Sequence, residues 1–271
     1  MNRGRDAIGG ADATELKACC AHVYQSNWAQ LILGNAFHPG GKRLTEYLGT
    51  AINLGPDQSV LDVASGQGTS AIWLAQRFGC TVLGVEYGRE AVNNATQAAA
   101  AAGVAHLVYF QQGDAECLPV RDSIFDAVIC ECAFCTFPNK AVAAAELTRV
   151  LKLGGRVGLS DLTRTGGVPE ELQSLLAWIA CLADAQPIED YARYLSDAGL
   201  VMNLTEPHDE ALADMVREIQ GKLLGAELLV KLKKIELPST LDFEQAKALA
   251  KSAAEAVQAH RFGYVVITAT K

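Results

Sequence analysis

The stretch "SVLDVASGQGTSAIWLA" at residues 59–75 constrains the fold more than any other part of this chain. An apolar run with strand character leads directly into Gly66-Gln67-Gly68, and a segment with helical spacing follows. Glycines in a strand-to-helix turn let the backbone approach a ligand, and the unpaired N–H groups at the helix start can bind it. The stretch therefore predicts an α/β sheet that binds a ligand at its edge, with a tight turn that binds nothing as the alternative.

The rest of the chain continues this alternation of strands and helices. Strand-like runs lie at 59–64, 81–86, 107–112, 125–130 and 155–161, and two more near 200–206 and 263–271. Ala-rich segments with helical spacing separate several of them. Strands joined by helices pair in parallel, so we expect an α/β fold with a doubly wound, mostly parallel, Rossmann-like sheet of about seven strands. Ligands of such sheets bind along the carboxyl edge.

Helical segments flank the expected sheet in the sequence. We expect N-terminal helices at about 12–33 and 44–52, joined by the loop "GNAFHPGG". The charged segments from about 209 to 260 are too long for a connection inside a sheet, so we expect a helical cap inserted before the last strand. The predicted organisation is an N-terminal helical lid (1–54), a core (55–206), a helical cap (207–262) and a final core strand (263–271).

Charge and hydropathy exclude several classes of partner. The formal net charge of −8 argues against nucleic-acid and anionic-membrane binding, because both need clustered Lys and Arg. No apolar run is long enough to span a bilayer, and the polar start "MNRGRDAIGG" lacks a signal-peptide pattern. We therefore expect a cytoplasmic monomer or dimer whose 8 cysteines are thiols rather than disulfides.

Asp62 distinguishes between two kinds of ligand for the glycine turn. Gly66-x-Gly68-x-x-Ala71 fits the dinucleotide fingerprint, with Glu86 as the ribose acceptor. A carboxylate four residues before Gly66 would repel the pyrophosphate of a dinucleotide, whereas a cofactor with an ammonium and a sulfonium group tolerates it. The sequence "DVASGQG" resembles motif I of class I S-adenosylmethionine-dependent methyltransferases, with Ala64 in place of the first glycine.

This resemblance covers about residues 55–165. It implies that Glu86 accepts from the ribose hydroxyls, and that Asp114 in "GDAECLP" meets the adenine amino group. "RVLKLGGRVGLSD" looks like the helix, turn and fifth strand of the family. The residues implied around S-adenosylmethionine are Asp62, Ser65, Gly66, Gly68, Glu86, Tyr87, Asp114, Ala115 and Glu131, with Tyr24 as a contact from the lid or as a core aromatic.

Three cysteines, Cys130, Cys132 and Cys135, close the fourth expected strand. A structural zinc site usually has two CxxC-type pairs, and "CECAFC" has no second pair, so zinc is a weak interpretation. A disulfide between Cys132 and Cys135 would be transient in a reducing compartment. Small buried apolar residues are the simplest interpretation for Cys130, and also for Cys80 and Cys117.

The context of Cys132 resembles the arsenite methyltransferases, where a cysteine after the fourth strand precedes a "P-D/N-K" helix start. Those enzymes carry a second cysteine downstream of a "PEE" segment, and "GVPEELQSLLAWIACLADA" places Cys181 there. The resemblance implies that Cys132 and Cys181 bind a metalloid substrate, with Cys135 or Cys20 as a third thiol. Only one cysteine of the Cys19-Cys20 pair is expected to point inward. As(III) prefers thiolate donors, and its lone pair can attack a sulfonium methyl group without a general base.

Two other functions remain open at this point. Quinone-biosynthesis C-methyltransferases share "DVASGQG" and "GDAECLP" and would methylate a small organic acceptor instead. A non-catalytic, thiol-based metal or metalloid binder is the second alternative. The metalloid hypothesis implies a thiol reductant as a partner. His38, in "AFHPGG", is expected to be a solvated loop residue rather than a substrate contact.

Overall fold

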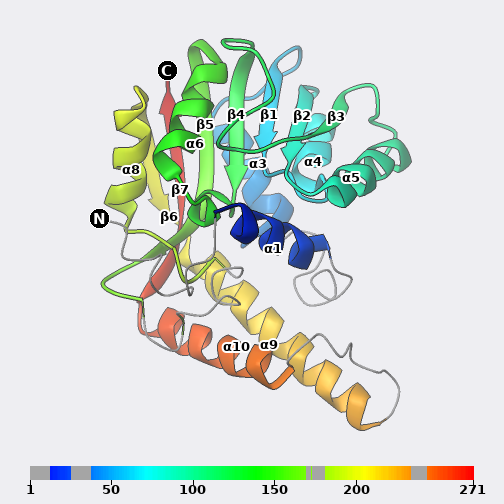
Figure 1. The fold of residues 1–271 in the computed structure, drawn as a ribbon, viewed down its shortest axis with the longest axis vertical. Coiled ribbons are helices and arrows are strands. Elements are labelled where there is room, and N and C mark those ends of the chain that lie inside the picture. Colours follow the sequence, from blue (N-terminus) through cyan, green and yellow to red (C-terminus); the bar gives the residue numbers. More distant parts are fainter. Residues whose placement is uncertain (1–12, 26–37, 169–171, 173–180, 233–242) are drawn as a thin grey trace.

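The computed structural model describes residues 13–25, 38–168, 172, 181–232 and 243–271 (Figure 1). Seven strands form one sheet in the order β3-β2-β1-β4-β5-β7-β6. The strands are β1 (Ser59–Val63), β2 (Thr81–Glu86), β3 (Val108–Gln112), β4 (Phe125–Glu131), β5 (Leu151–Arg164), β6 (Val201–Pro207) and β7 (Phe262–Thr270). β7 runs antiparallel to both of its neighbours, and the pairs among β1 to β5 are parallel. The predicted fold class is confirmed.

Helices lie on both faces of the sheet and beyond its carboxyl edge (Figure 1). They are α1 (Ala13–Gln25), α3 (Gly41–Ala51), α4 (Thr69–Phe78), α5 (Arg89–Ala101), α6 (Lys140–Val150), α8 (Ile188–Asp197), α9 (Asp209–Lys231) and α10 (Phe243–Gln258), with the short 3-10 helix η2 (Phe134–Thr136). α9 and α10 pack on each other between β6 and β7 in the chain, where the cap was expected. Among the described residues, no helix has the length and apolar character needed to cross a membrane.

The hydrophobic core explains why the sequences of the central strands are continuous apolar runs. Leu61 of β1, Ile129 of β4 and Leu159 of β5 are fully buried, because helices cover both faces of a parallel sheet. Strand β6, at the edge of the sheet, instead alternates between exposed and half-buried residues. The pattern of hydrophobic residues in the sequence alone therefore distinguishes central strands from edge strands.

The register brings the polar ends of four neighbouring strands to one edge. Asp62 of β1 lies opposite Gly84 of β2 on one side and Ile129 of β4 on the other. Glu86 therefore ends β2, and Glu131 ends β4, just beyond the level of Asp62. In strand order, the carboxyl edge presents the segment after β3, then Glu86, the turn after β1, and Glu131.

Several element bounds differ from the expectations. α3 begins at Gly41, earlier than predicted, because Gly40 adopts a left-handed conformation (φ 76°) that starts the helix there. β5 extends past residue 161 to Arg164 because its carboxyl end pairs with β7 up to Arg164. The predicted continuation of α1 to residue 33 and the segment 169–180, apart from residue 172, lie outside the described residues. The division into lid, core and cap stays a prediction.

Candidate active site

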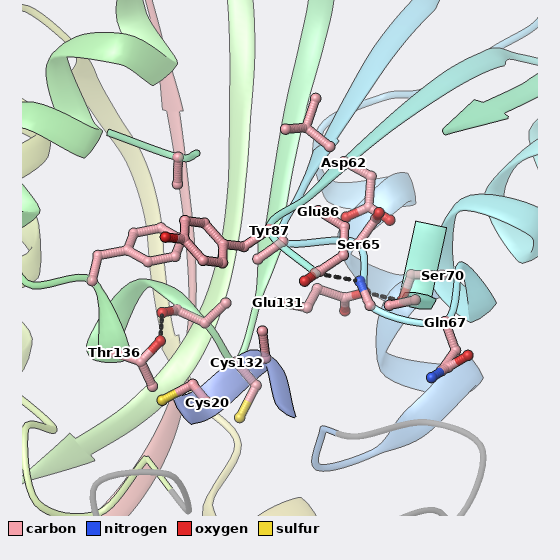
Figure 2. Close-up of a pocket in the computed structure, with 18 of the residues that line it drawn as sticks. Cys20, Asp62, Ser65, Gln67, Ser70, Glu86, Tyr87, Glu131, Cys132 and Thr136 are labelled. Atoms are coloured by element: carbon pink, nitrogen blue, oxygen red, sulfur yellow. Dashed lines mark hydrogen bonds between the residues drawn. The ribbon is translucent and has the colours of Figure 1, made fainter. Parts of the chain in front are cut away.

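A pocket opens at the carboxyl edge of the sheet, between α1 and the ends of β1, β2 and β4 (Figure 2). Its polar lining contains four carboxylates, from Asp62, Glu86, Asp114 and Glu131, and the basic side chains of Lys17 and His38. Other lining residues include Cys20, Ser65, Gly66, Gln67, Ser70, Tyr87, Ala115, Cys132 and Thr136. The predicted cofactor residues other than Gly68 and Tyr24 therefore line one cavity. The side chain of Tyr24 lies outside the described part of the structure.

The glycine turn brings backbone into contact with the pocket. Gly66 and Gly68 both have positive φ, 52° and 76°, a conformation that favours glycine. A side chain at Gly68 would also approach the ring of Phe110 to 2.4 Å. Gly68 lies beneath the turn, where its N–H donates to the Ser65 carbonyl at 2.9 Å. Its role is therefore to shape the turn, whereas Gly66 lines the cavity.

Glu86 is held by the turn it faces. Its two carboxylate oxygens accept from the N–H groups of Gly66 at 3.0 Å and Gly88 at 2.8 Å. Burial raises the pKa of Glu86, although these N–H groups act in the opposite direction. A carboxylate fixed in this way can still accept hydrogen bonds from ligand hydroxyls, because each oxygen has a second lone pair.

Asp62 is a buried carboxyl group beneath the same turn. Burial, together with the charges of Glu131 and Glu86, raises the pKa of Asp62 well above its ordinary value. Its Oδ2 atom, Ser65 Oγ and Gln67 Nε2 are buried and have no hydrogen-bond partner among the described residues. Unpaired buried polar atoms around a cavity with four carboxylates fit a polar ligand with positive charge, which S-adenosylmethionine is.

Asp114 is bound by helix α1. Lys17 donates to Asp114 Oδ1 and Oδ2 at 3.0 and 2.8 Å, and to Glu116 Oε2 at 2.8 Å. All three side chains are largely shielded from solvent. This pairing of residues about 100 positions apart keeps one face of α1, including Cys20, against the pocket. Cys20, rather than Cys19, lines the cavity, as expected for a pair on one helix.

Glu131 lies in a cluster of buried polar side chains. Its Oε2 accepts from Ser70 Oγ at 2.7 Å and from Thr45 Oγ1 at 3.0 Å. His38 Nε2 lies 3.6 Å from the same oxygen. The prediction that His38 is solvated was wrong: its side chain is 7% exposed, because the turn before α3 packs it against the start of α4.

Cys132 and Cys181 meet beside this cluster. Their sulfur atoms are 3.9 Å apart, and Cys181 Sγ also lies 3.4 Å from the carbonyl oxygen of Cys132. Both residues have positive φ, 52° and 64°, which is uncommon for a side chain other than Gly, Asn or Asp. Such strain persists only where the surroundings impose it, and it concentrates at functional sites.

Two further thiols surround that pair. Cys135 is fully buried in η2, and its N–H donates to Asp161 Oδ2 at 2.8 Å. Burial raises the pKa of Cys20 to about 12, and nearby Cys181 adds to the effect. A hydrogen bond to Cys181, followed by burial, raises the pKa of Cys132. The side chains of Cys20 and Cys132 are therefore protonated thiols in the folded protein. No three His, Cys, Asp or Glu side chains within the described ranges are placed to hold one metal ion.

The remaining cysteines separate into core and surface. Cys80 and Cys130 are fully buried, as expected. Cys117 was predicted to be buried and is exposed, because it lies in the polar turn between β3 and β4 rather than on a strand. All 8 cysteines are free of disulfides.

Sequence reasoning missed four residues of this region, Lys17, Thr45, Ser70 and Asp161. Ser70 follows the glycine turn directly, so its place at a helix start was a usable signal. Asp161 lies within the buried run of β5, where a carboxylate is unusual. Lys17 and Thr45 carry no local signal, since their partners are distant in the sequence.

Residues 61–159 match the family described as a methyltransferase domain. This range contains the glycine turn, Glu86, Asp114, Glu131 and Cys132. Together with the sheet topology and the pocket at its carboxyl edge, the match supports an S-adenosylmethionine-dependent methyltransferase.

Particular relatives act on different acceptors, according to their names. The chain is 28% identical over 254 residues to methyltransferase GfsG of Streptomyces halstedii, covering 92% of this chain and 87% of that protein. It is 32% identical over 161 residues to an arsenite methyltransferase of Halobacterium salinarum, covering 58% of this chain but 41% of the relative. In fold it is similar to geranyl diphosphate C-methyltransferase of Streptomyces coelicolor A3(2), with TM-score 0.74, 17% identity and coverage of 96% and 99%.

Proposed function

We propose that the protein transfers a methyl group from S-adenosylmethionine to a metalloid bound by Cys132 and Cys181, most directly arsenite. The observation that carries this proposal is the pair of sulfur atoms 3.9 Å apart, in two strained residues, beside the cofactor pocket. Metal–thiolate bonds are about 2.3 Å long, so one soft atom bonded to both sulfurs fits this separation. The methyltransferase relative that is named for arsenite supports this acceptor.

The order of the strands supports one orientation of the cofactor. Asp114, after β3, would receive the adenine amino group, and Glu86, at the end of β2, would receive the ribose hydroxyls. Asp62 and the glycine turn, on β1, and Glu131 and Cys132, on β4, would then surround the sulfonium with its methyl group. This order follows the length of the cofactor from adenine to methyl group.

The thiols can bind arsenite without a dedicated base. Each protonated thiol replaces one hydroxide of As(OH)₃, the As–S bond forms as the As–O bond breaks, and the thiol proton leaves with the hydroxide as water. The raised pKa values of Cys132 and Cys135 are consistent with binding in the thiol form. Cys135 or Cys20 would supply a third sulfur.

Transfer then needs mainly alignment and exclusion of water. Bound S-adenosylmethionine would supply the methyl group as an electrophile: the arsenic lone pair would form the As–C bond as the sulfonium S–C bond breaks, and S-adenosylhomocysteine would be the leaving group. Cys181 and Cys135 are almost fully buried, so a metalloid bound there is shielded from solvent. Holding two reactants at near-attack distance supplies much of the rate enhancement in such reactions. A thiol reductant would return the oxidised arsenic product to the trivalent state.

An organic acceptor is the second candidate. The match to methyltransferase GfsG extends over most of both chains, whereas the arsenite methyltransferase match covers the core alone. In that case the thiols would form one wall of an apolar acceptor pocket.

Acceptor identity is tested by incubating the protein with labelled methyl donor and a thiol reductant. Arsenite is compared with a panel of phenols, quinones and small amines. We expect methylated arsenic from wild type and from the Cys117→Ser control, and a loss of at least ~100-fold in Cys132→Ser and Cys181→Ser. Transfer to an organic acceptor that survives both substitutions would contradict the proposal. Arsenite binding without any methylated product would indicate a non-catalytic binder.

A further inference from the structure

A buried ion pair joins the two segments that carry Cys132 and Cys181. Lys140, at the start of α6, donates from Nζ to Asp184 Oδ2, and the two side chains are 5% and 19% exposed. Lysine is rarely buried, because removing its ammonium group from water is costly even where a partner charge compensates. Lys140 does not line the cofactor pocket, so its burial calls for an explanation in this part of the fold.

Lys140 also contacts the backbone of the segment that contains Cys132. Its Nζ donates to the Phe137 carbonyl oxygen at 3.1 Å, in the turn between η2 and α6. The start of this segment is bound to β5, since the N–H of Cys132 donates to the Ser160 carbonyl at 2.7 Å. One ammonium group therefore contacts both the segment after β4 and the segment after Cys181.

Asp184 is fixed in turn to the carboxyl end of β5. Its Oδ1 accepts from Gln186 Nε2 at 3.0 Å, and the Gln186 carbonyl oxygen accepts from the Arg164 N–H at 3.1 Å. The segment after Cys181 therefore has a defined position relative to β5. The ion pair connects that segment to the one after β4.

We propose that Lys140 and Asp184 are positioning residues that set the separation of the Cys132 and Cys181 sulfur atoms for a metalloid. Both cysteines have left-handed backbone, and such a conformation persists only where the surrounding structure imposes it. The ion pair supplies this constraint from outside the thiol site, because it joins the two segments beyond the cysteines. This inference rests on the proposed thiol site and names the residues that hold it in shape.

The test uses variants that keep the fold. Removing one partner alone would leave an uncompensated buried charge, whereas apolar side chains of similar size often replace a buried ion pair without loss of stability. The main variant is therefore Lys140→Met/Asp184→Leu. Asp184→Asn keeps a hydrogen-bond acceptor for Lys140, so it should change the site in the same direction by less. Val60→Ala, which opens a cavity at the amino end of β1, controls for a general loss of stability.

Phenylarsine oxide is the probe, because its arsenic binds two thiols at once. Two As–S bonds form, the As–O bond breaks, the oxygen leaves with both thiol protons as water, and arsenic stays trivalent. We expect the double variant to bind the probe at least ~10-fold more weakly than wild type, because a misplaced second thiol has a lower effective concentration. Iodoacetamide, which needs one thiol only, should alkylate Cys132 and Cys181 in the double variant no more slowly than in wild type.

The controls separate the ion pair from the thiol site itself. Val60→Ala should bind the probe as wild type does, and Cys132→Ser defines binding that does not need the two thiols. The proposal is overturned if the double variant binds within ~3-fold of wild type, or if Val60→Ala loses as much affinity. If the double variant does not fold, an unchanged affinity in Asp184→Asn overturns it instead.

Failure of this proposal is distinguishable from failure of the proposed function. Wild type that binds the probe no more tightly than Cys132→Ser would contradict both. Wild type that binds the probe tightly, with the expected loss in the double variant but no methylation of arsenite, would contradict the proposed acceptor alone and support the role of Lys140 and Asp184.

Discussion

Cys132 and Cys181 are 49 positions apart in the chain, yet their sulfur atoms lie 3.9 Å from each other and both residues have left-handed backbone. Cys132 is held there by the neighbouring strand β5, since its N–H donates to the Ser160 carbonyl at 2.7 Å. Two independent turns thus adopt an unfavourable conformation at one point of contact. We infer that the thiol side chains, and not the backbone, are what this point requires.

Glycine should therefore be tolerated better than alanine at both positions. A left-handed conformation costs a residue with a Cβ about 1–2 kcal/mol, which glycine avoids. We expect Cys132→Gly and Cys181→Gly to unfold at higher urea concentration than the corresponding alanine variants. Their free energies of unfolding should be larger by about 1 kcal/mol. Cys130, on a regular strand, is the matched control and should show the reverse order. Alanine more stable than glycine at Cys132 and Cys181 would refute the strain argument.

Glu86→Gln should weaken cofactor binding by ~10- to 100-fold, corresponding to about 1.4–2.7 kcal/mol. An amide can accept from one of Gly66 N–H and Gly88 N–H but not from both in the present geometry, and it lacks the charge that holds ligand hydroxyls. Titration with S-adenosylhomocysteine measures the effect. Glu90→Gln, an exposed neighbour with the same charge change, should bind as wild type. Equal affinities for the two variants would remove Glu86 from the cofactor site.

The stability of the cofactor-free protein should fall as the pH rises from about 4 to about 7. Burial, and then the charge of Cys181, raise the pKa of Asp161 to about 7, although N–H groups of Cys135 and Leu162 oppose the shift. In this interval the folded protein holds a proton that the unfolded carboxyl, with a pKa of about 3.9, has lost. The free energy of unfolding therefore decreases with pH and levels off above about 7. Asp62 and Glu86 act with the same sign.

Urea unfolding between about pH 5 and pH 8 tests this slope. Asp161→Asn should show a smaller decrease of the free energy of unfolding with pH. The variant should also be less stable at every pH, because its amide group cannot replace both hydrogen bonds. Parallel curves for wild type and variant would show that Asp161 is ionised in the folded protein throughout this range.

Lys17→Met should release α1 from the pocket. The substitution keeps the length of the side chain but removes both ion pairs, and it leaves Asp114 and Glu116 to repel each other. Cys20, one turn further along the same helix, should then react several-fold faster with an alkylating reagent, as measured by peptide mass spectrometry. Lys152→Met, which removes an ion pair on β5 outside the pocket, is the control. An unchanged rate at Cys20 would show that Lys17 does not hold the helix.

The sheet was predictable because its signals are local. Runs of buried residues such as Leu61 and Ile129 identify the central strands, and the glycine turn identifies the ligand edge without knowledge of any distant contact. The place of the carboxylates Asp62, Glu86 and Asp114 in the pocket follows from the same reasoning, since each lies within or just after a strand.

The features that were missed depend on contacts between distant segments. His38 was expected in solvent because its loop is polar, and only the packing of α3 against α4 buries it beside Glu131. Lys17 is bound to Asp114 across 97 positions, for which no periodicity in the sequence gives a signal. The exposure of Cys117 was missed for a related reason. Its residue type suggests burial, but the turn in which it lies exposes its side chain.

The central claim is that Cys132 and Cys181 hold the methyl acceptor. X-ray absorption at the arsenic edge, measured on the protein with bound arsenite, tests it most directly. We predict sulfur neighbours only in wild type and in Cys117→Ser, with at least one sulfur replaced by oxygen in both Cys132→Ser and Cys181→Ser. Arsenic surrounded by oxygen in the wild-type protein, or a sulfur shell unchanged by both substitutions, would contradict the claim.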